Sequence, residues 1–370
     1  MTSTLADRRF SINWVLPVAN MSGGTKSNRL LAEAMVRRGH RVRIIYPSMG
    51  KAWPSMRHPR RWLARAVKEL HAVGRQRHHL ESSSAELLPV RERPIRGESV
   101  PDADFAVATW WETREWIESW PREKGRPIYM VRGYELHGGD PERVASTYRL
   151  AGQKFVISRW LQRVMAEEYG DLTTVLVSNG VDRDQFSAPP RARSDPPRVG
   201  MLYGHAVWKG SETAFEAIRL VQGRIPALGV VAFGSQRPAR GTALPRNFEF
   251  HHRPPQRELS KLYAGCDCWV VSSTFEGFGM PGIEAAACRC PIVSTRCGGP
   301  EDYVKDGVNG YLVPVGDAGE MAEGILKVLT CEPREWLRMS TESLEISRQF
   351  DWDRSAEIME RTLIAQFDAG

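Results

Sequence analysis

The sequence contains no long uncharged apolar run and no cysteine before residue 266. No segment approaches the roughly 18 apolar residues of a membrane-spanning helix, and the first ten residues, MTSTLADRRF, lack the apolar core of a secretion signal. Two Cys-x-Cys pairs are present, but structural zinc sites favour Cys-x₂₋₄-Cys, and no His-x₃₋₅-His accompanies them. We therefore expect a reduced, cytoplasmic protein without a metal site. Its thiols are expected to be buried; they belong to Cys266, Cys268, Cys288, Cys290, Cys297 and Cys331.

Length and composition indicate an ordinary globular protein with two domains. The chain has 370 residues, of which 42% are hydrophobic and 26% charged. A disordered or fibrous chain is excluded by this balance. At roughly 150 residues per domain, two domains with cores of their own are expected.

The excess of positive charge is concentrated in one segment. The chain carries 51 Lys and Arg against 44 Asp and Glu, a formal net charge of +7. Residues 51–80 contain eight bases and one acid, so this window alone has a net charge of 8 − 1 = +7. A basic coat over the whole protein is disfavoured, and no nucleic-acid partner is expected.

Short runs rich in Val and Ile alternate with helical patterns along the chain, which predicts an α/β fold with parallel sheets covered on both faces. Residues 187–198 contain four prolines and no periodic pattern, so we predict a linker there. The predicted strands are 12–18, 42–46, 105–109, 128–131, 155–158, 174–177, 199–203, 230–233, 248–251, 269–272, 292–295 and 311–313. The predicted helices are 26–38, 212–222, 256–264, 318–330, 333–347 and 354–367.

The strongest motif is FEGFGMPGIEAAA at residues 275–287, directly after a predicted strand. Glycines let a backbone approach a ligand closely, and a helix that starts near Pro281 presents free N–H groups to an anion such as a phosphate. Glu276 and Glu284 stand eight residues apart, and a carboxylate accepts hydrogen bonds well from paired sugar hydroxyls. The alternative is a glycine turn with two solvated acids.

Glu276-x₇-Glu284 with its Gly-Phe-Gly resembles the E-x₇-E signature of retaining glycosyltransferases of the GT-B fold, glycosyltransferase family 4 (group 1). Residues 39–42, 259–271, 298–312 and 350–352 are similar to further family segments. The resemblance implies two Rossmann-like domains facing a central cleft, with a C-terminal helix crossing back to the first. The domains expected are 1–186 on the acceptor side, the linker 187–198, 199–349 for the nucleotide sugar, and the helix 350–370.

The resemblance also implies roles in the second domain. Glu284 would hold the nucleotide ribose, and Glu276 the transferred sugar. Backbone N–H groups beside Gly277 would meet the diphosphate or the sugar, namely those of Phe278, Gly279 and Met280.

Lys209 precedes the first helix of the second domain, where an ammonium would stabilise charge that develops on the departing diphosphate. The family usually adds an Arg five residues earlier, but Gly204 stands there, so His205 is the expected helper. A solvated loop lysine is the alternative for Lys209.

In the first domain, Gly23 and Gly24 precede a helix, where they suit close approach to the phosphate or sugar of the donor, and they resemble the Gly-Gly of the family's first loop. Taken alone, they could form only a tight turn. Many family members carry a His soon after the strand predicted at 128–131, but Arg132 or Gly133 occupies that place here. Glu135 and His137 are the catalytic candidates there, and Glu135 is the better one because Gly133-Tyr134-Glu135 resembles a variant of some bacterial subgroups of the family.

The predicted function is transfer of a glycosyl unit from a nucleotide sugar to a hydroxyl acceptor, glycan, lipid-linked or small, with retention. No acid is marked as a nucleophile, so a front-face mechanism is expected, which needs mainly positioning and charge stabilisation. No metal and no cofactor beyond the donor are expected. A GT-B-fold sugar-nucleotide epimerase and a non-catalytic basic module that binds membrane or polyanion remain as alternatives.

The basic segment has three interpretations. Residues 59–73 predict an amphipathic helix with a basic face. In the first interpretation, residues 57–80, which contain this helix, bind the inner, cytoplasmic face of an anionic membrane, as such a helix does in family members that act on lipid-linked acceptors. It otherwise packs on the first sheet with a solvated basic face, or attracts an anionic acceptor.

Overall fold

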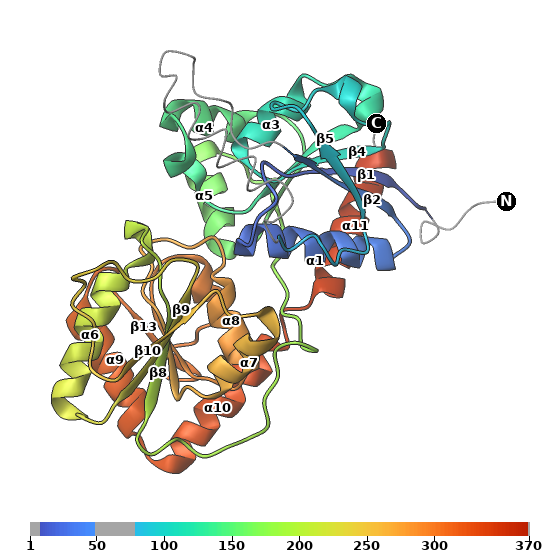
Figure 1. Cartoon of the computed structure of the whole chain (residues 1–370). Coiled ribbons are helices and arrows are strands. Elements are labelled where there is room, and N and C mark those ends of the chain that lie inside the picture. Colours follow the sequence, from blue (N-terminus) through green and yellow to red (C-terminus); the bar gives the residue numbers. More distant parts are fainter. Residues whose placement is uncertain (1–7, 49–77, 369–370) are drawn as a thin grey trace. The chain divides into compact units, whose positions relative to one another are not determined.

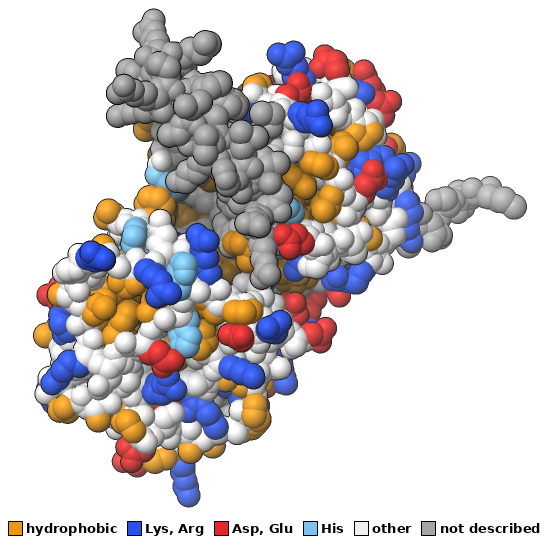
Figure 2. Space-filling view, viewed as in Figure 1, with side chains coloured by type: hydrophobic (Ala, Val, Ile, Leu, Met, Phe, Trp, Pro, Cys, Tyr) orange, Lys and Arg blue, Asp and Glu red, His pale blue; other side chains and the backbone are white. Residues whose placement is uncertain are grey.

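The computed structural model describes residues 8–48 and 78–368. The helix predicted at 59–73, and most of the basic segment 57–80 with it, lies outside the described residues. Among the described helices none is long and apolar enough to cross a membrane. On the face visible in Figure 2, basic side chains are spread over the described surface with acidic side chains between them.

The chain divides into two compact units. Unit 1 comprises residues up to Ile157, Gln162–Val177 and the C-terminal stretch from Trp352, whereas unit 2 comprises Ser158–Leu161 and Ser178–Asp351. Each unit is an α/β structure built on one parallel sheet (Figure 1).

The sheet of unit 1 has seven parallel strands in the order β3-β2-β1-β4-β5-β6-β7. Ile12 pairs with Val42 on one side and Phe105 on the other, so the central strand is covered along both edges. The strands are β1 (Ser11–Val15), β2 (Arg41–Pro47), β3 (Glu86–Val90), β4 (Phe105–Ala108), β5 (Arg126–Val131), β6 (Lys154–Val156) and β7 (Val175–Leu176). Its α-helices within the described residues are α1 (Gly23–Arg37), α3 (Trp111–Glu118), α4 (Pro141–Arg149), α11 (Trp352–Asp368) and α5 (Arg159–Tyr169), which belongs to this unit from Gln162 onward.

Helix α11 completes unit 1, although it follows unit 2 in the chain. It lies beside α1 (Figure 1), and the Arg38 guanidinium forms an ion pair with Glu360. His40 accepts a hydrogen bond at Nδ1 from the Phe10 N–H and donates from Nε2 to Glu360 Oε1 at 3.0 Å. Burial lowers the pKa of His40, so the ring is neutral at pH 7 and connects the residues just before β2 to α11.

The sheet of unit 2 has six parallel strands in the order β10-β9-β8-β11-β12-β13. Helices α6 and α9 cover one face, and α7, α8 and α10 cover the other (Figure 1). The strands are β8 (Arg198–Leu202), β9 (Gly229–Gly234), β10 (Phe248–His252), β11 (Cys268–Val271), β12 (Ile292–Thr295) and β13 (Gly310–Val313). The helices are α6 (Ser211–Arg224), α7 (Gln256–Ala264), α8 (Met280–Ala287), α9 (Ala318–Thr330) and α10 (Pro333–Ser347).

The elements of unit 2 follow the sequence prediction closely, and those of unit 1 less so. Helices α7, α9 and α10 have the predicted bounds. The prediction omitted β3, α3, α4 and α5. Strand β3 contains Pro89, which cannot donate a backbone hydrogen bond, and it lies at the edge of the sheet where that donor is not needed.

Residues 187–198, predicted as a linker, lie in unit 2 and are bonded to it. Asp267 is 0% exposed, and its Oδ1 accepts from Arg191 Nη1 at 2.7 Å and from the Ser194 N–H at 2.9 Å. Its Oδ2 accepts from the Arg198 N–H at 2.7 Å. The Arg191 guanidinium also lies over the ring of Trp336. Residues 187–197 therefore have no regular secondary structure but a fixed path over unit 2, and Arg198 begins β8.

Candidate functional site

The candidate site of unit 2 is built at the carboxyl ends of β8 and β11, which are neighbours in the sheet. The turn Val207–Lys209 follows β8, and its backbone is bonded to the segment after β11. Ser272 Oγ donates to the Lys209 carbonyl at 2.8 Å, and the Thr274 N–H donates to the Trp208 carbonyl at 2.8 Å. Gly210 has φ +60°, and a Cβ there would lie 1.9 Å from the Ser272 carbonyl oxygen. Only glycine permits this close approach of the two backbones, which fixes the position of the Lys209 backbone.

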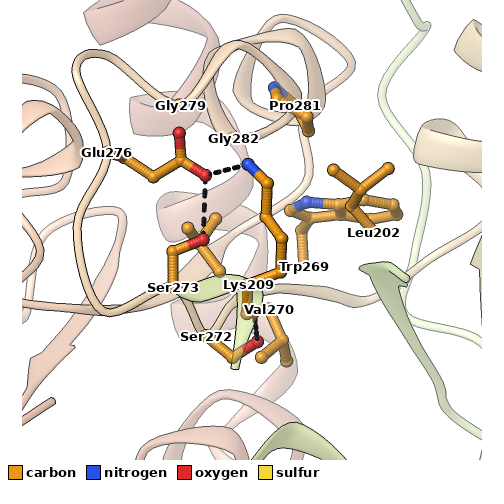
Figure 3. A pocket seen from close by; sticks show the side chains of 11 residues that line it. Leu202, Lys209, Trp269, Val270, Ser272, Ser273, Glu276, Gly279, Pro281 and Gly282 are labelled. Atoms are coloured by element: carbon orange, nitrogen blue, oxygen red, sulfur yellow. Dashed lines mark hydrogen bonds and ion pairs between the residues drawn. The ribbon is translucent and has the colours of Figure 1, made fainter. Parts of the chain in front are cut away.

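Lys209 and Glu276 meet at this site. Lys209 Nζ donates to Glu276 Oε1 at 2.5 Å, and Ser273 Oγ donates to the same oxygen at 2.8 Å (Figure 3). Both partners of the ion pair are partly exposed, so a ligand can reach them. They line a hollow together with Leu202, Trp269, Val270, Val271, Ser272, Ser273, Gly279, Pro281 and Gly282. The arrangement offers one cation and one carboxylate to a ligand that carries an anion beside hydroxyl groups.

The glycines of the motif serve packing as well as access. Gly279 caps α8 with φ +78°, and the Tyr303 hydroxyl donates to its carbonyl at 2.8 Å. A Cβ at Gly282 would lie 2.3 Å from that hydroxyl. Phe278 is buried against Tyr303, and Met280 Sδ accepts from Asn179 at 3.5 Å. Tyr303 therefore explains two glycines that the sequence argument ascribed to a ligand.

The backbone of Glu276 is held on both sides. Its N–H donates to the Cys297 carbonyl at 2.7 Å, and its carbonyl accepts from the Gly299 N–H at 2.8 Å. Gly277 follows directly in the same turn. These bonds keep the start of the turn in place while the side chain of Glu276 points toward Lys209 (Figure 3).

Glu284, the second carboxylate of the motif, is 4% exposed. Its Oε2 accepts a hydrogen bond from the Tyr263 hydroxyl at 2.9 Å. Burial and the neighbouring carboxylate raise the pKa of Tyr263 well above its ordinary value, so the hydroxyl remains a donor. Tyr263 occupies one acceptor position of the carboxylate, which can accept further hydrogen bonds without releasing it.

His205 is exposed after β8, and its Nε2 lies 2.8 Å from the Arg237 carbonyl oxygen. Gly204 precedes it, and a Cβ there would lie 3.2 Å from Lys209 Cγ. His205 thus contacts Arg237, whereas Lys209 is the predicted cation that contacts Glu276.

In unit 1, Gly23 and Gly24 form the first turn of α1, three residues before the predicted start. Ser22 caps the helix by accepting from the Thr25 N–H at 3.3 Å. A Cβ at Gly24 would meet only Ser22 Oγ, at 3.7 Å, so packing does not require glycine there. Close approach of a ligand therefore remains a possible explanation for a glycine at this position.

Glu135, the better catalytic candidate predicted after β5, is buried. It is 1% exposed, and its Oε2 accepts from the Trp111 N–H at 2.8 Å and from the Tyr129 hydroxyl at 3.1 Å. Burial raises the pKa of Glu135 to about 8. Its visible role is to cap α3, whereas His137 is exposed, with its ring 6.2 Å from that of Trp110.

Glu135→Gln is expected to change how stability depends on pH. Since the folded protein keeps this carboxyl protonated above the pH at which the unfolded chain releases the proton, its contribution is present at low pH. It is lost as pH rises toward about 8, with a slope of at most about 1.4 kcal/mol per pH unit. Urea unfolding from pH 5 to 8 should show the variant gaining on wild type as pH rises. An exposed-site control, Glu123→Gln, should follow wild type; a parallel wild-type and Glu135→Gln profile would contradict the raised pKa.

Ser273 was not predicted, because a lone serine hydroxyl belongs to no recognisable pattern. Three Asp-x-Asp triplets, a spacing that binds metal-bound nucleotide in other transferases, were not considered either: Asp102 and Asp104, Asp182 and Asp184, and Asp351 and Asp353. In the structure five of these acids accept hydrogen bonds from protein groups: Asp102 from Lys124, Asp104 from Ser11, Asp182 from the Gln185 N–H, Asp351 from Arg183 and Asp353 from Arg37. Asp184 is exposed. Within residues 8–48 and 78–368, no group of three or more metal-ligating side chains is placed to hold an ion.

The cysteines are free, and five are buried, as predicted; Cys331 is half-buried. Burial raises the pKa of Cys297, which lies close to Glu276, to about 12. These thiols are therefore protonated and unreactive at neutral pH.

Comparison with known proteins agrees with this geometry. Residues 182–343, which contain Lys209 and Glu276, match the family model of glycosyl transferases group 1. A D-inositol 3-phosphate glycosyltransferase of Geodermatophilus obscurus is 28% identical over 83% of this chain and 63% of its own length. A sucrose synthase of Acidithiobacillus caldus is 33% identical over 27% of this chain and 13% of its own length. The chain thus spans less than two thirds of the length of these curated relatives.

Solved structures share the fold. HepE of Anabaena, in complex with UDP-glucose, has a TM-score of 0.73 and 18% identity, over 96% of this chain and all of that one. Sucrose-phosphate synthase from Thermosynechococcus elongatus has a TM-score of 0.71 and 17% identity, over 98% of this chain and all of that one. The predicted GT-B fold and the resemblance to group 1 glycosyltransferases are confirmed. These comparisons favour neither the epimerase nor the non-catalytic module.

Proposed function

We propose that this chain, whose residues 182–343 match glycosyl transferases group 1, is a retaining, metal-independent glycosyltransferase that moves a sugar from a nucleotide sugar to a hydroxyl acceptor. The observation that supports it best is the contact of Lys209 with Glu276 at the carboxyl ends of β8 and β11. An ammonium suits a diphosphate, and a carboxylate suits sugar hydroxyls. UDP-glucose, which HepE binds in its solved complex, is the natural first donor to test.

In the proposed reaction, Lys209 stabilises the negative charge that grows on the diphosphate as the bond to the sugar breaks. Glu276 accepts hydrogen bonds from hydroxyls of the sugar and fixes its orientation. Since these two groups bond to each other at 2.5 Å in the free protein, donor binding exchanges their mutual contact for contacts with the ligand. Retention is assigned to front-face attack by the acceptor, which asks the protein for positioning and charge stabilisation rather than for a carboxylate nucleophile.

The remaining assignments are proposals of the same kind. Glu284 and the backbone beside Phe278, Gly279 and Met280 hold the nucleotide end of the donor. Gly23, Gly24, Glu135 and His137 belong to the acceptor-side domain, whereas His205 assists Lys209. The basic segment 57–80 attaches the enzyme peripherally to the inner face of an anionic membrane.

The first experiment is a thermal-shift panel of nucleoside diphosphates and nucleotide sugars on the full chain. A ligand that binds the folded state stabilises it by mass action, by about 2.7 kcal/mol at a concentration 100 times the Kd, and the midpoint should rise. No rise with any donor at millimolar concentration would contradict a nucleotide-sugar site. Incubation of the bound donor without an acceptor, followed by product analysis, separates transfer from epimerisation.

The two motif carboxylates should differ in their effects. Glu284→Ala is expected to raise the Kd of the nucleoside diphosphate by about 10–150-fold, because a hydrogen bond to a charged group contributes about 1.5–3 kcal/mol. Glu276→Ala is expected to leave that Kd nearly unchanged and to lower kcat instead, because its partner is the sugar. Calorimetric titration and a transfer assay measure the two quantities. Glu320→Ala, at an exposed acid of α9, is the control; wild-type behaviour of both motif variants would contradict the assignment.

A further inference from the structure

Ser273 occupies a fixed position between the end of β11 and Glu276. The residue is 3% exposed, and its carbonyl accepts a hydrogen bond from Thr295 Oγ1 at 2.5 Å. Its Oγ donates to Glu276 Oε1 at 2.8 Å (Figure 3). The hydroxyl is thus aimed at the carboxylate by a buried main chain that Thr295 of the neighbouring strand β12 holds in place.

Two donors converge on the same oxygen, and they differ in mobility. Lys209 reaches Glu276 Oε1 at the end of a long flexible side chain, whereas Ser273 reaches it through one rotatable bond from a buried backbone. If Lys209 turns to the diphosphate when the donor binds, Glu276 loses its cation. Ser273 is the group that remains on the carboxylate.

We propose that Ser273 is a positioning residue, which holds the Glu276 carboxylate toward the transferred sugar while Lys209 contacts the diphosphate. This inference rests on the proposed function of Lys209 and Glu276. It assigns Ser273 to the sugar end of the donor, so the nucleoside diphosphate alone should not depend on it.

The test compares Ser273→Ala and Ser273→Thr with wild type and with Thr274→Ala, which removes an exposed hydroxyl from the next residue. Calorimetric titration with UDP and with UDP-glucose is the first readout. Ser273→Ala should bind UDP-glucose about tenfold more weakly and UDP as wild type does. Ser273→Thr, which restores a hydroxyl, and Thr274→Ala should resemble wild type. An equal loss for both ligands, or no loss, would overturn the proposal.

A second readout needs no ligand. The carboxyl of Glu276 can be followed by carbon-13 NMR in glutamate-labelled protein, with Glu276→Gln identifying its signal. Its chemical shift should change in Ser273→Ala, because the carboxylate loses a hydrogen bond from Ser273, and should return in Ser273→Thr; an unchanged chemical shift would contradict the role of Ser273. If wild type binds neither UDP nor UDP-glucose while this change is seen, the choice of donor fails and the positioning of Glu276 by Ser273 stands.

Discussion

Lys209→Ala is expected to lower kcat of glycosyl transfer by about 10²–10³-fold, the usual loss when one group that stabilises developing negative charge is removed. The effect should be large because the Lys209 ammonium lies 2.5 Å from Glu276 Oε1, and Glu276 is the partly exposed carboxylate predicted to bind the transferred sugar. The donor Kd should rise less than kcat falls, since the charge on the diphosphate grows as the bond breaks. Initial rates with the donor found by thermal shift measure both parameters.

Lys261→Ala supplies the matched control, because Lys261 is an exposed lysine on α7 outside the site. Lys209→Arg keeps the charge but changes the shape and reach of the donor, and partial activity is expected from it. Wild-type kcat in Lys209→Ala would show that Lys209 is the solvated loop lysine of the alternative interpretation.

Asp267→Ala is expected to reduce the free energy of unfolding by about 3–5 kcal/mol, the loss typical of a buried ion pair from which one partner is removed. The carboxylate is fully buried and accepts from the Arg191 guanidinium and from the N–H groups of Ser194 and Arg198. Its removal leaves those donors without an acceptor in the interior. Urea unfolding followed by tryptophan fluorescence should show the loss, since Trp336 lies beneath Arg191.

Two variants make this result specific. Asp184→Ala removes an exposed acid ahead of the same stretch and should change the free energy of unfolding by less than about 0.5 kcal/mol. Asp267→Asn retains one oxygen acceptor and should lie between wild type and alanine. A loss below about 1 kcal/mol in Asp267→Ala would mean that residues 187–198 are a loose connection, as the sequence suggested.

The sequence predicted unit 2 well because its strands are short apolar runs separated by clear helical periods. Unit 1 was harder, since Pro89 disfavours a strand assignment for β3, and only Val90 of that strand is buried. Helix α3 is short and rich in polar residues, so its pattern is weak as well. In both units, the presence of the buried strands and their order along the chain could be predicted from their apolar composition. Strands at the edge of a sheet, such as β3, depend on tertiary context.

The site shows a similar division. Lys209 and Glu276 were each predicted from their local motifs, but their contact depends on the pairing of β8 with β11, which no local pattern specifies. Ser273 escaped notice because a single serine after a strand is common. The glycines at 279 and 282 were identified, and the reason given for them changed once Tyr303 was seen against them.

Helix α11 has a consequence for how the protein is made. Residues 352–368 are synthesised only after the whole of unit 2. During most of synthesis α1 therefore lacks α11, the helix that packs against it in the folded protein. Until then Arg38 and His40 have no Glu360 to bind, and the face of α1 that α11 covers is open to solvent. Unit 2, whose residues between 178 and 351 are contiguous, can therefore reach its native structure first, although it is synthesised second.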